Sequence, residues 1–310
     1  MYVFGVDLGG TTVKMGYFNT DGELLEKWEI PTRKDNDGEY ILPDIAASIK
    51  EKMTEKNMKQ EDVIGVGIGV PGPVDKDGVI YKAANLGWGV FSIKETLSKL
   101  LNGMKVEAGN DANVAALGEM WKGGGRGYSN MVAVTLGTGV GGGIIIDGKI
   151  VTGATGAGGE IGHIHVNDNE DSTCGCGNKG CLEQYASATG ITRLATIRLA
   201  KDDEPSILRD DELNAKRIWD AVKAGDKVAI QIAKQFGDYL GKGLATVACT
   251  VNPEVFVIGG GVSKAGNILF DYIVSPYKKY VFHGSREAKF ALAMLGNDAG
   301  IFGAAKLVIM

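Results

Sequence analysis

Short apolar runs that end at glycine, asparagine or aspartate alternate with helical periodicity along the first 122 residues. The runs predict β-strands at 2–6, 13–18, 24–30, 63–70 and 104–108, because this length and these boundaries are typical of strands. Residues 40–58 place Ile41, Ile45, Ile49 and Met53 on one stripe, which predicts an amphipathic helix. Strands that alternate with helices favour an α/β architecture.

The opening pattern returns in the second half of the chain. An apolar run, a Leu-Gly pair, small polar residues, a second apolar run and an Asp-Gly turn occur near 2–22 and again near 131–148. Helices are predicted at 187–200, 212–223, 227–250, from Ser263 onward and at 301–308, and strands at 255–258 and 288–295. Glycine-rich residues 123–127 are a candidate linker. The internal repeat predicts two α/β lobes with related cores and a cleft between them.

Composition narrows the class of protein. The 310 residues are 44% hydrophobic and carry a net charge of −5, which argues against nucleic acid or an anionic membrane as a partner. No signal peptide and no run of roughly 18 apolar residues is present, so we expect a cytoplasmic protein. Glycine makes up 47 residues, about twice the usual share of about 7%, which favours loops whose backbone approaches a ligand.

One segment concentrates metal-binding side chains. His163, Cys174, Cys176 and Cys181 supply one imidazole and three thiols within 19 residues, a set that suits tetrahedral Zn²⁺. A disulfide would need an oxidising compartment, which nothing else in the sequence indicates. Four protein ligands leave no open position on the metal, so we expect the zinc to be structural.

Two carboxylates flank the segment that carries these ligands, residues 163–181, which we call the zinc loop. Glu160 precedes it and Glu183 follows it. They are either solvated surface groups or ligands for sugar hydroxyls, because acceptors held rigidly discriminate between hydroxyl patterns. The rigid loop between them favours the second interpretation.

Three glycine loops follow apolar strands, and each is a candidate phosphate site. Backbone N–H groups in such turns bind anions, and threonine hydroxyls add donors. A single loop of this kind is more often a plain hairpin turn, whereas two near-copies predict a grip on a polyphosphate. None of them is a Walker P-loop or a dinucleotide fingerprint. Asp7 precedes the first loop and is either a turn residue or a Mg²⁺ ligand. The loop residues are Gly9, Gly10, Thr11 and Thr12, then Gly137, Thr138 and Gly139, and then Gly259, Gly260 and Gly261.

Asn110 and Asp111 follow a strand and open a helix. The pair is typical of a helix N-cap. Asp111 is also placed to accept a proton from a substrate hydroxyl during phosphoryl transfer. The two roles are compatible, because a capping site lies at the positive end of a helix.

With these residues identified, the chain resembles the ROK family of sugar kinases over nearly its full length. Residues 5–11 (GVDLGGT) resemble the family's first phosphate loop and residues 136–143 its second. Residues 158–163 (GGEIGH) and 174–183 (CGCGNKGCLE) resemble its sugar and zinc signature. The resemblance implies a two-lobed ribonuclease-H-like fold shared with actin and hexokinase. It also implies lobes at 1–122 and 123–298, with a terminal helix at about 299–310 that returns to the first lobe.

The resemblance further implies ATP-dependent phosphorylation of glucose at its 6-hydroxyl, with Asp111 as general base. N-acetylmannosamine, fructose and allose stay open as acceptors, and polyphosphate stays open as donor. Mg²⁺ would lie near Asp7, structural Zn²⁺ in the Cys3His set, and the protein would be a homodimer or homotetramer. The implied sugar ligands are Asn85, Asn110, Asp111, Glu160, His163 and Glu183. The implied ATP contacts are Gly9, Gly10, Thr11, Thr12, Thr138 and Gly139 for the phosphates, and Gly259, Gly260 and Gly261 for the nucleoside.

Two features qualify the resemblance. Thr12 and Val13 stand where many relatives have a lysine, so a side-chain charge contact in the first loop is open to question. The family also contains sugar-responsive repressors, which carry a helix-turn-helix ahead of the first strand. Here the first predicted strand begins at Tyr2, and we therefore expect an enzyme.

Overall fold

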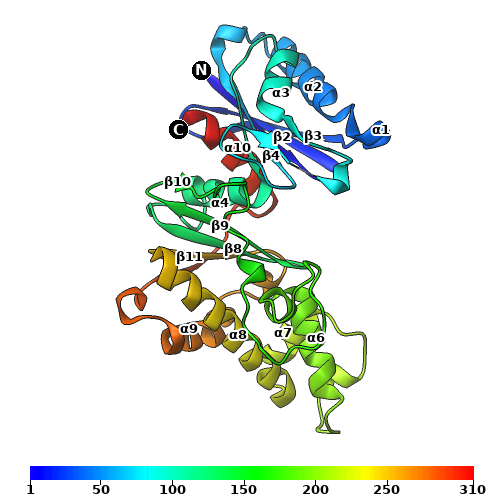
Figure 1. Ribbon diagram of the computed structural model, residues 1–310, viewed down its shortest axis with the longest axis vertical. Coiled ribbons are helices and arrows are strands. Elements are labelled where there is room, and N and C mark those ends of the chain that lie inside the picture. Colours follow the sequence, from blue (N-terminus) through cyan, green and yellow to red (C-terminus); the bar gives the residue numbers. More distant parts are fainter. Residues whose placement is uncertain (82) are drawn as a thin grey trace. The chain divides into compact units, whose positions relative to one another are not determined.

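The computed structural model describes residues 1–81 and 83–310 and divides into two compact units (Figure 1). The first unit comprises residues 1–127, 143–159 and 295–310, and the second comprises 128–142 and 160–294. The first contains β1 (Tyr2–Leu8), β2 (Thr12–Asn19), β3 (Leu24–Pro31), α1 (Asp35–Gly38), α2 (Ile41–Glu55), β4 (Val63–Val70), β5 (Val79–Ile80), β6 (Phe91–Ser92), α3 (Ile93–Leu100), β7 (Val106–Asn110), α4 (Asp111–Lys122), β10 (Lys149–Ile150) and α10 (Ala299–Ile309).

The second unit is richer in helix. It contains β8 (Met131–Leu136), α5 (Glu183–Ala186), α6 (Ala188–Leu199), α7 (Ala215–Lys223), α8 (Lys227–Val251), β11 (Val255–Gly259), α9 (Ile268–Tyr280) and β12 (Lys289–Leu292). Strand β9 (Val140–Ile146) begins in the second unit and ends in the first. Among the described residues, no helix combines the length and the apolar character needed to span a membrane.

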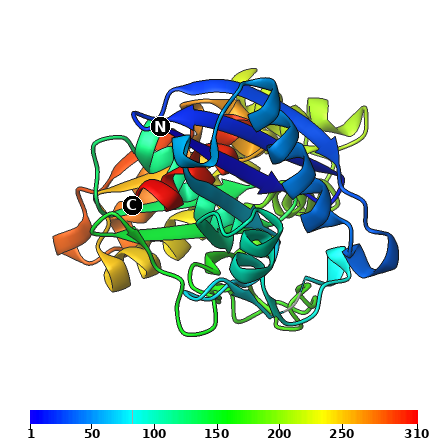
Figure 2. The same cartoon turned by 90° about the horizontal axis from the view of Figure 1, so that it is seen from above.

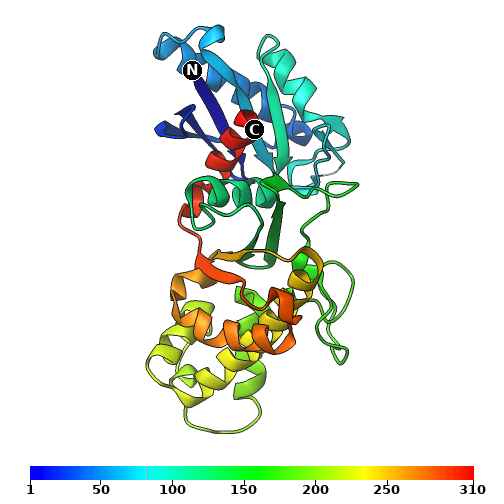
Figure 3. The same ribbon diagram turned by 90° about the vertical axis from the view of Figure 1, so that its left-hand side faces the viewer.

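The first sheet has the strand order β3-β2-β1-β4-β7. Its side chains alternate between two apolar layers, because successive residues of a strand point to opposite faces. Phe4 belongs to the buried cluster that contains Ile45 of α2. The next residue back, Val3, belongs to the cluster that contains Ile301 and Val308 of α10. The sheet is therefore covered on one face by α2 and α3 and on the other by α10 (Figure 3).

Helix α10 packs directly on the backbone of the sheet. A Cβ atom on Gly5 would lie 2.0 Å from the carbonyl oxygen of Ile301, and one on Gly67 would lie 1.7 Å from that of Ala304. Only glycine fits at such close approaches. Both chain termini consequently lie on the first unit (Figure 2).

The second sheet repeats this topology. Its order is β10-β9-β8-β11-β12, which matches the first sheet strand by strand in chain order. The β8–β11 and β11–β12 pairs are parallel, as are β1–β4 and β4–β7. The internal repeat predicted from the sequence is confirmed.

Two predicted helices differ in their boundaries. The helix predicted at 212–223 begins only at Ala215, because the Asn214 side chain accepts a hydrogen bond from the Arg217 N–H and caps it there. The helix predicted from Ser263 is instead a 3₁₀ turn, Val262–Ala265, followed by α9. Gly266 separates them at a φ of 86°, a conformation that interrupts a helix.

Candidate active site

Three parallel strands of the first unit end at one edge of the sheet. In register, Asp7 of β1 lies beside Gly69 of β4, and Val70 of β4 lies beside Asn110 of β7. In α/β sheets, ligands bind outside the carboxyl ends of the strands. The register therefore brings the predicted Asp7 and Asn110–Asp111 positions to one candidate site.

Asn110 and Asp111 form an ordered pair at the N-terminus of α4. Asn110 Oδ1 accepts from the Asn113 N–H at 3.1 Å, so Asn110 caps the helix. Its Nδ2 donates to the Gly72 carbonyl at 3.1 Å and to Asp111 Oδ1 at 3.0 Å. The Ala112 N–H donates to the same Asp111 oxygen at 2.8 Å. The cap and an oriented carboxylate thus coexist at this position.

Asp7 occupies a confined position at the end of β1. Burial raises the pKa of its carboxyl to about 6, the charge of Lys14 opposes this rise, and the charge of Asp111 adds to it. A Cβ atom on Gly300 would lie 2.4 Å from Asp7 Cγ, so the carboxylate packs against the N-terminal turn of α10. Lys14 was not identified from the sequence, although the predicted hairpin places it opposite Asp7.

The first glycine loop is a tight turn between β1 and β2. The Gly9 N–H donates to the Thr12 carbonyl at 3.0 Å, and the Thr32 hydroxyl donates to the Gly9 carbonyl at 2.8 Å. Asn85 lies, exposed, on the separate 3₁₀ turn Ala84–Leu86. Its predicted contact with sugar stays a prediction.

The second unit brings the four predicted zinc ligands together. One ligand atom from each of His163, Cys174, Cys176 and Cys181 lies within 4.8 Å of all the others. The Cys176 and Cys181 sulfurs are 3.7 Å apart, too far for a disulfide. Two sulfurs on one tetrahedral zinc, each at about 2.3 Å from the metal, would lie about 3.8 Å apart. This donor set and spacing fit Zn²⁺.

The imidazole and thiols agree with that assignment. His163 Nδ1 lies 3.8 Å from the Cys174 sulfur, so the opposite ring nitrogen, Nε2, is directed away from the cluster. Burial raises the pKa of the Cys181 thiol to about 12, and metal binding at neutral pH must therefore release its proton. His165 instead contacts Asp168 and the Lys179 carbonyl, each at 2.9 Å, and stays outside the set as predicted.

A buried carboxylate gives the zinc loop a second anchor. Glu170 accepts hydrogen bonds from the Tyr185 hydroxyl, from the Ser172 N–H at 2.8 Å and from Arg193 Nη2 at 2.7 Å. Burial raises the pKa of Glu170, but these donors together bring it down to about 2. Sequence reasoning missed this group, since two of its three donors, Tyr185 and Arg193, come from α5 and α6.

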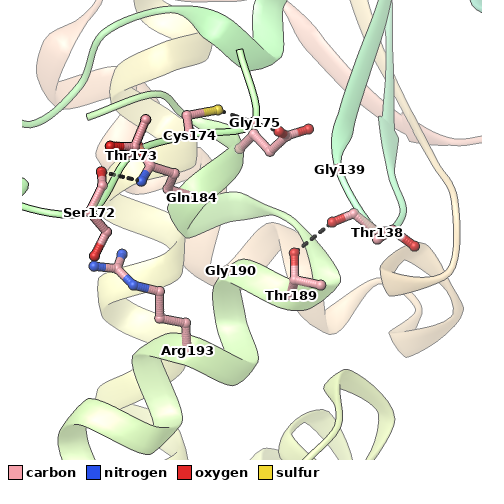
Figure 4. Close-up of a pocket in the computed structure, with 11 residues that line it drawn as sticks. Thr138, Gly139, Ser172, Thr173, Cys174, Gly175, Gln184, Thr189, Gly190 and Arg193 are labelled. Atoms are coloured by element: carbon pink, nitrogen blue, oxygen red, sulfur yellow. Dashed lines mark hydrogen bonds between the residues drawn. The ribbon is translucent and has the colours of Figure 1, made fainter. Parts of the chain in front are cut away.

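The second glycine loop is held by the segment that follows the zinc loop. The Ala188 N–H donates to the Gly137 carbonyl at 2.7 Å, and the Thr189 hydroxyl donates to the Thr138 carbonyl at 2.6 Å (Figure 4). A pocket of about 420 Å³ opens between this loop and the zinc loop. The residues that line it are Thr138, Gly139, Ser172, Thr173, Cys174, Gly175, Glu183, Gln184, Thr189, Gly190 and Arg193.

The third glycine loop adjoins the second. Gly259 pairs with Thr135 across β11 and β8, and a Cβ atom on Gly260 would lie 2.6 Å from the Leu136 carbonyl. Gly260 has a φ of 82°, which favours glycine there. Two of the three predicted loops are therefore neighbours within one unit. Glu160 lies, exposed, just before the 3₁₀ turn Ile161–His163, whose histidine is a predicted zinc ligand.

Comparison with known proteins identifies the family of the chain. The ROK family model matches residues 3–310. Glucokinase of Halalkalibacterium halodurans is 44% identical over 98% of this chain and 94% of its own, and glucokinase of Thermotoga maritima is 38% identical over 99% and 96%. The solved structure of a ROK family glucokinase from Streptomyces griseus, in complex with glucose and AMPPNP, has a TM-score of 0.74 at 34% identity over 99% of both chains. The chain belongs to the ROK family.

Proposed function

We propose that the protein is a glucokinase, which transfers the γ-phosphoryl group of ATP to the 6-hydroxyl of glucose. The observation that carries the proposal is the Asp111 carboxylate, oriented by Asn110 and Ala112 at the N-terminus of α4 beside Asp7. The choice of glucose as the acceptor is supported by relatives named glucokinase, which are up to 44% identical to this chain.

Asp111 accepts the proton of the sugar 6-hydroxyl as that oxygen forms a bond to the γ-phosphorus. The bond from the γ-phosphorus to the β–γ bridging oxygen breaks, and ADP leaves with that electron pair. Two donors to Asp111 Oδ1 hold the carboxylate in orientation for the transfer, and a base within reach of the hydroxyl is what general base catalysis requires. Placement and charge stabilisation supply most of the catalysis in phosphoryl transfer.

The glycine loops bind the nucleotide in this proposal. Gly9, Gly10, Thr11 and Thr12 in the first unit and Thr138 and Gly139 in the second direct N–H groups and hydroxyls at the phosphates. Gly259–Gly261 approach the nucleoside. Mg²⁺ bound near Asp7 would neutralise charge on the phosphates. Burial of the Asp7 carboxyl, which favours its neutral form without a cation, fits such a site.

The zinc loop serves recognition of the sugar. Glu160, the Nε2 side of His163 and Glu183 bind sugar hydroxyls together with Asn85 and Asn110. His163 and the three cysteines would hold Zn²⁺, which would fix the spacing of Glu160, His163 and Glu183 and take no part in the chemistry. The homo-oligomeric state expected from the family stays a prediction.

An assay of sugar phosphate formation, the product common to both donors, tests the proposal. Glucose, N-acetylmannosamine, fructose and allose are each offered with Mg-ATP and, separately, with polyphosphate. We expect the highest kcat/KM for glucose with ATP. If none of these sugars is phosphorylated, the proposed function is contradicted. If another sugar is preferred over glucose, the protein is a kinase but its acceptor is that other sugar.

A further inference from the structure

The Glu183 carboxylate contacts both the strand that follows the second glycine loop and the Cys3His cluster. Its Oε2 accepts the main-chain N–H of Val140 at 3.0 Å, and its Oε1 accepts the Cys174 thiol at an S···O distance of 3.6 Å. Val140 immediately follows the second glycine loop, and Cys174 belongs to the zinc set. Glu183 therefore lies between the predicted phosphate site and the predicted metal site.

The glycine loop is shaped around this carboxylate. A Cβ atom on Gly139 would lie 2.0 Å from Glu183 Oε2, so the close approach requires glycine. The fully buried Ser187 donates its hydroxyl to the Glu183 carbonyl at 2.7 Å and fixes the main chain behind the side chain. Glu183 thus joins Ala188 and Thr189 as a third attachment of the loop.

We propose that Glu183 is a positioning residue for nucleotide binding, in addition to its role as a ligand of sugar. This inference rests on the proposed function, which makes the loop a phosphate site. Hydrogen bonds to charged acceptors are stronger than neutral ones. Holding a glycine-rich loop in its binding conformation before the ligand arrives lowers the entropy cost of binding.

The two oxygens of Glu183 divide these roles. Oε2 accepts the Val140 N–H and holds the glycine loop. The proposed contact with a sugar hydroxyl is assigned to Oε1, the oxygen on the Cys174 side. A ligand of sugar that did nothing more would leave nucleotide affinity unchanged when it is truncated.

Nucleotide affinity measured without sugar separates the two roles. The zinc-loaded full chain is titrated calorimetrically with AMPPNP and Mg²⁺. Glu183→Ala should weaken binding about tenfold, the size expected for one hydrogen bond to a charged group. Glu160→Ala is the matched control: it removes the other flanking carboxylate, which lies outside the lining of the loop's pocket, and should leave nucleotide affinity unchanged. Glu183→Gln, whose amide oxygen can accept from Val140, should lose less than Glu183→Ala.

Zinc content is measured for each variant, and a variant that binds less zinc is judged by a second readout. In Glu183→Gln, the Val140 amide proton should shift upfield in a ¹H–¹⁵N spectrum, because a neutral acceptor replaces a charged one. Equal nucleotide affinity in wild type and Glu183→Ala, or an unmoved Val140 resonance in Glu183→Gln, would overturn the inference. Failure of the wild type itself to bind AMPPNP would instead contradict the proposed function.

Discussion

Asp7 and Lys14 stand directly opposite each other across the antiparallel strands β1 and β2. The positive charge of Lys14 lowers the pKa of Asp7, against the larger effect of burial that raises it to about 6. The first glycine loop, Gly9–Thr12, contains no lysine of its own, but Lys14 lies beside its acidic neighbour Asp7.

Lys14→Met should move the acidic limb of the pH–activity profile to higher pH. Without the lysine charge, the pKa of Asp7 rises further above 6, and less of the carboxylate is ionised to bind Mg²⁺. The measurement is kcat/KM for Mg-ATP across the acidic range. Lys27→Met removes an exposed lysine of the neighbouring strand β3 and should leave the limb in place. An unmoved limb in Lys14→Met would show that another group controls it.

Asp7→Asn should abolish turnover yet stabilise the fold at neutral and alkaline pH. The folded protein holds the Asp7 proton more tightly than the unfolded chain, so the free energy of unfolding falls as pH rises from 3.8 to about 6 and stays lower above that. A shift of about two pKa units corresponds to about 3 kcal/mol. Asparagine has no carboxyl to ionise, so the variant avoids the free-energy cost of a buried negative charge.

Urea unfolding of Asp7→Asn and wild type, without Mg²⁺ and nucleotide, measures the effect. At about pH 8 the variant should be more stable by up to about 3 kcal/mol, and below pH 3.8 the difference should vanish. A variant less stable than wild type at about pH 8 would mean that Asp7 is held by favourable contacts rather than by confinement.

Cys176→Ser should lower zinc content and thermal stability together. The variant removes one of four ligands from a site that fits tetrahedral zinc, and we expect a fall in the unfolding midpoint of about 5 °C or more. The loop should still fold, because Glu170 anchors it to Tyr185 and Arg193. The exposed Cys249, which lies outside the cluster, supplies the control Cys249→Ser. A Cys176→Ser protein with full activity and no zinc would contradict the bracing role.

The Cys3His cluster was predictable because its four residues lie close together in the sequence and their chemistry is distinctive. The repeated sheet was predictable for a similar reason: strand, glycine loop, strand and turn recur in the same local order near 2–22 and 131–148. The position of Lys14 was predictable as well, because a hairpin that turns at Gly9–Thr12 places Lys14 opposite Asp7.

Contacts between distant segments were not predictable. Glu183 of α5 accepts a hydrogen bond from the Val140 N–H of β9, which lies 43 residues away in the sequence. Glu170 meets Arg193 only through the packing of α6. A single sequence shows where these carboxylates lie along the chain, but the donors that each one accepts from depend on tertiary packing.

The role of Asp111 is the central claim, and Asp111→Asn tests it most directly. Asparagine keeps an oxygen for the Ala112 N–H but cannot take a proton from the sugar, so kcat should fall by about a thousandfold, while glucose affinity measured by calorimetry should change little. Asp21→Asn, at an exposed turn residue after β2, should behave as wild type. A kcat near the wild-type value in Asp111→Asn would contradict the assignment of the general base.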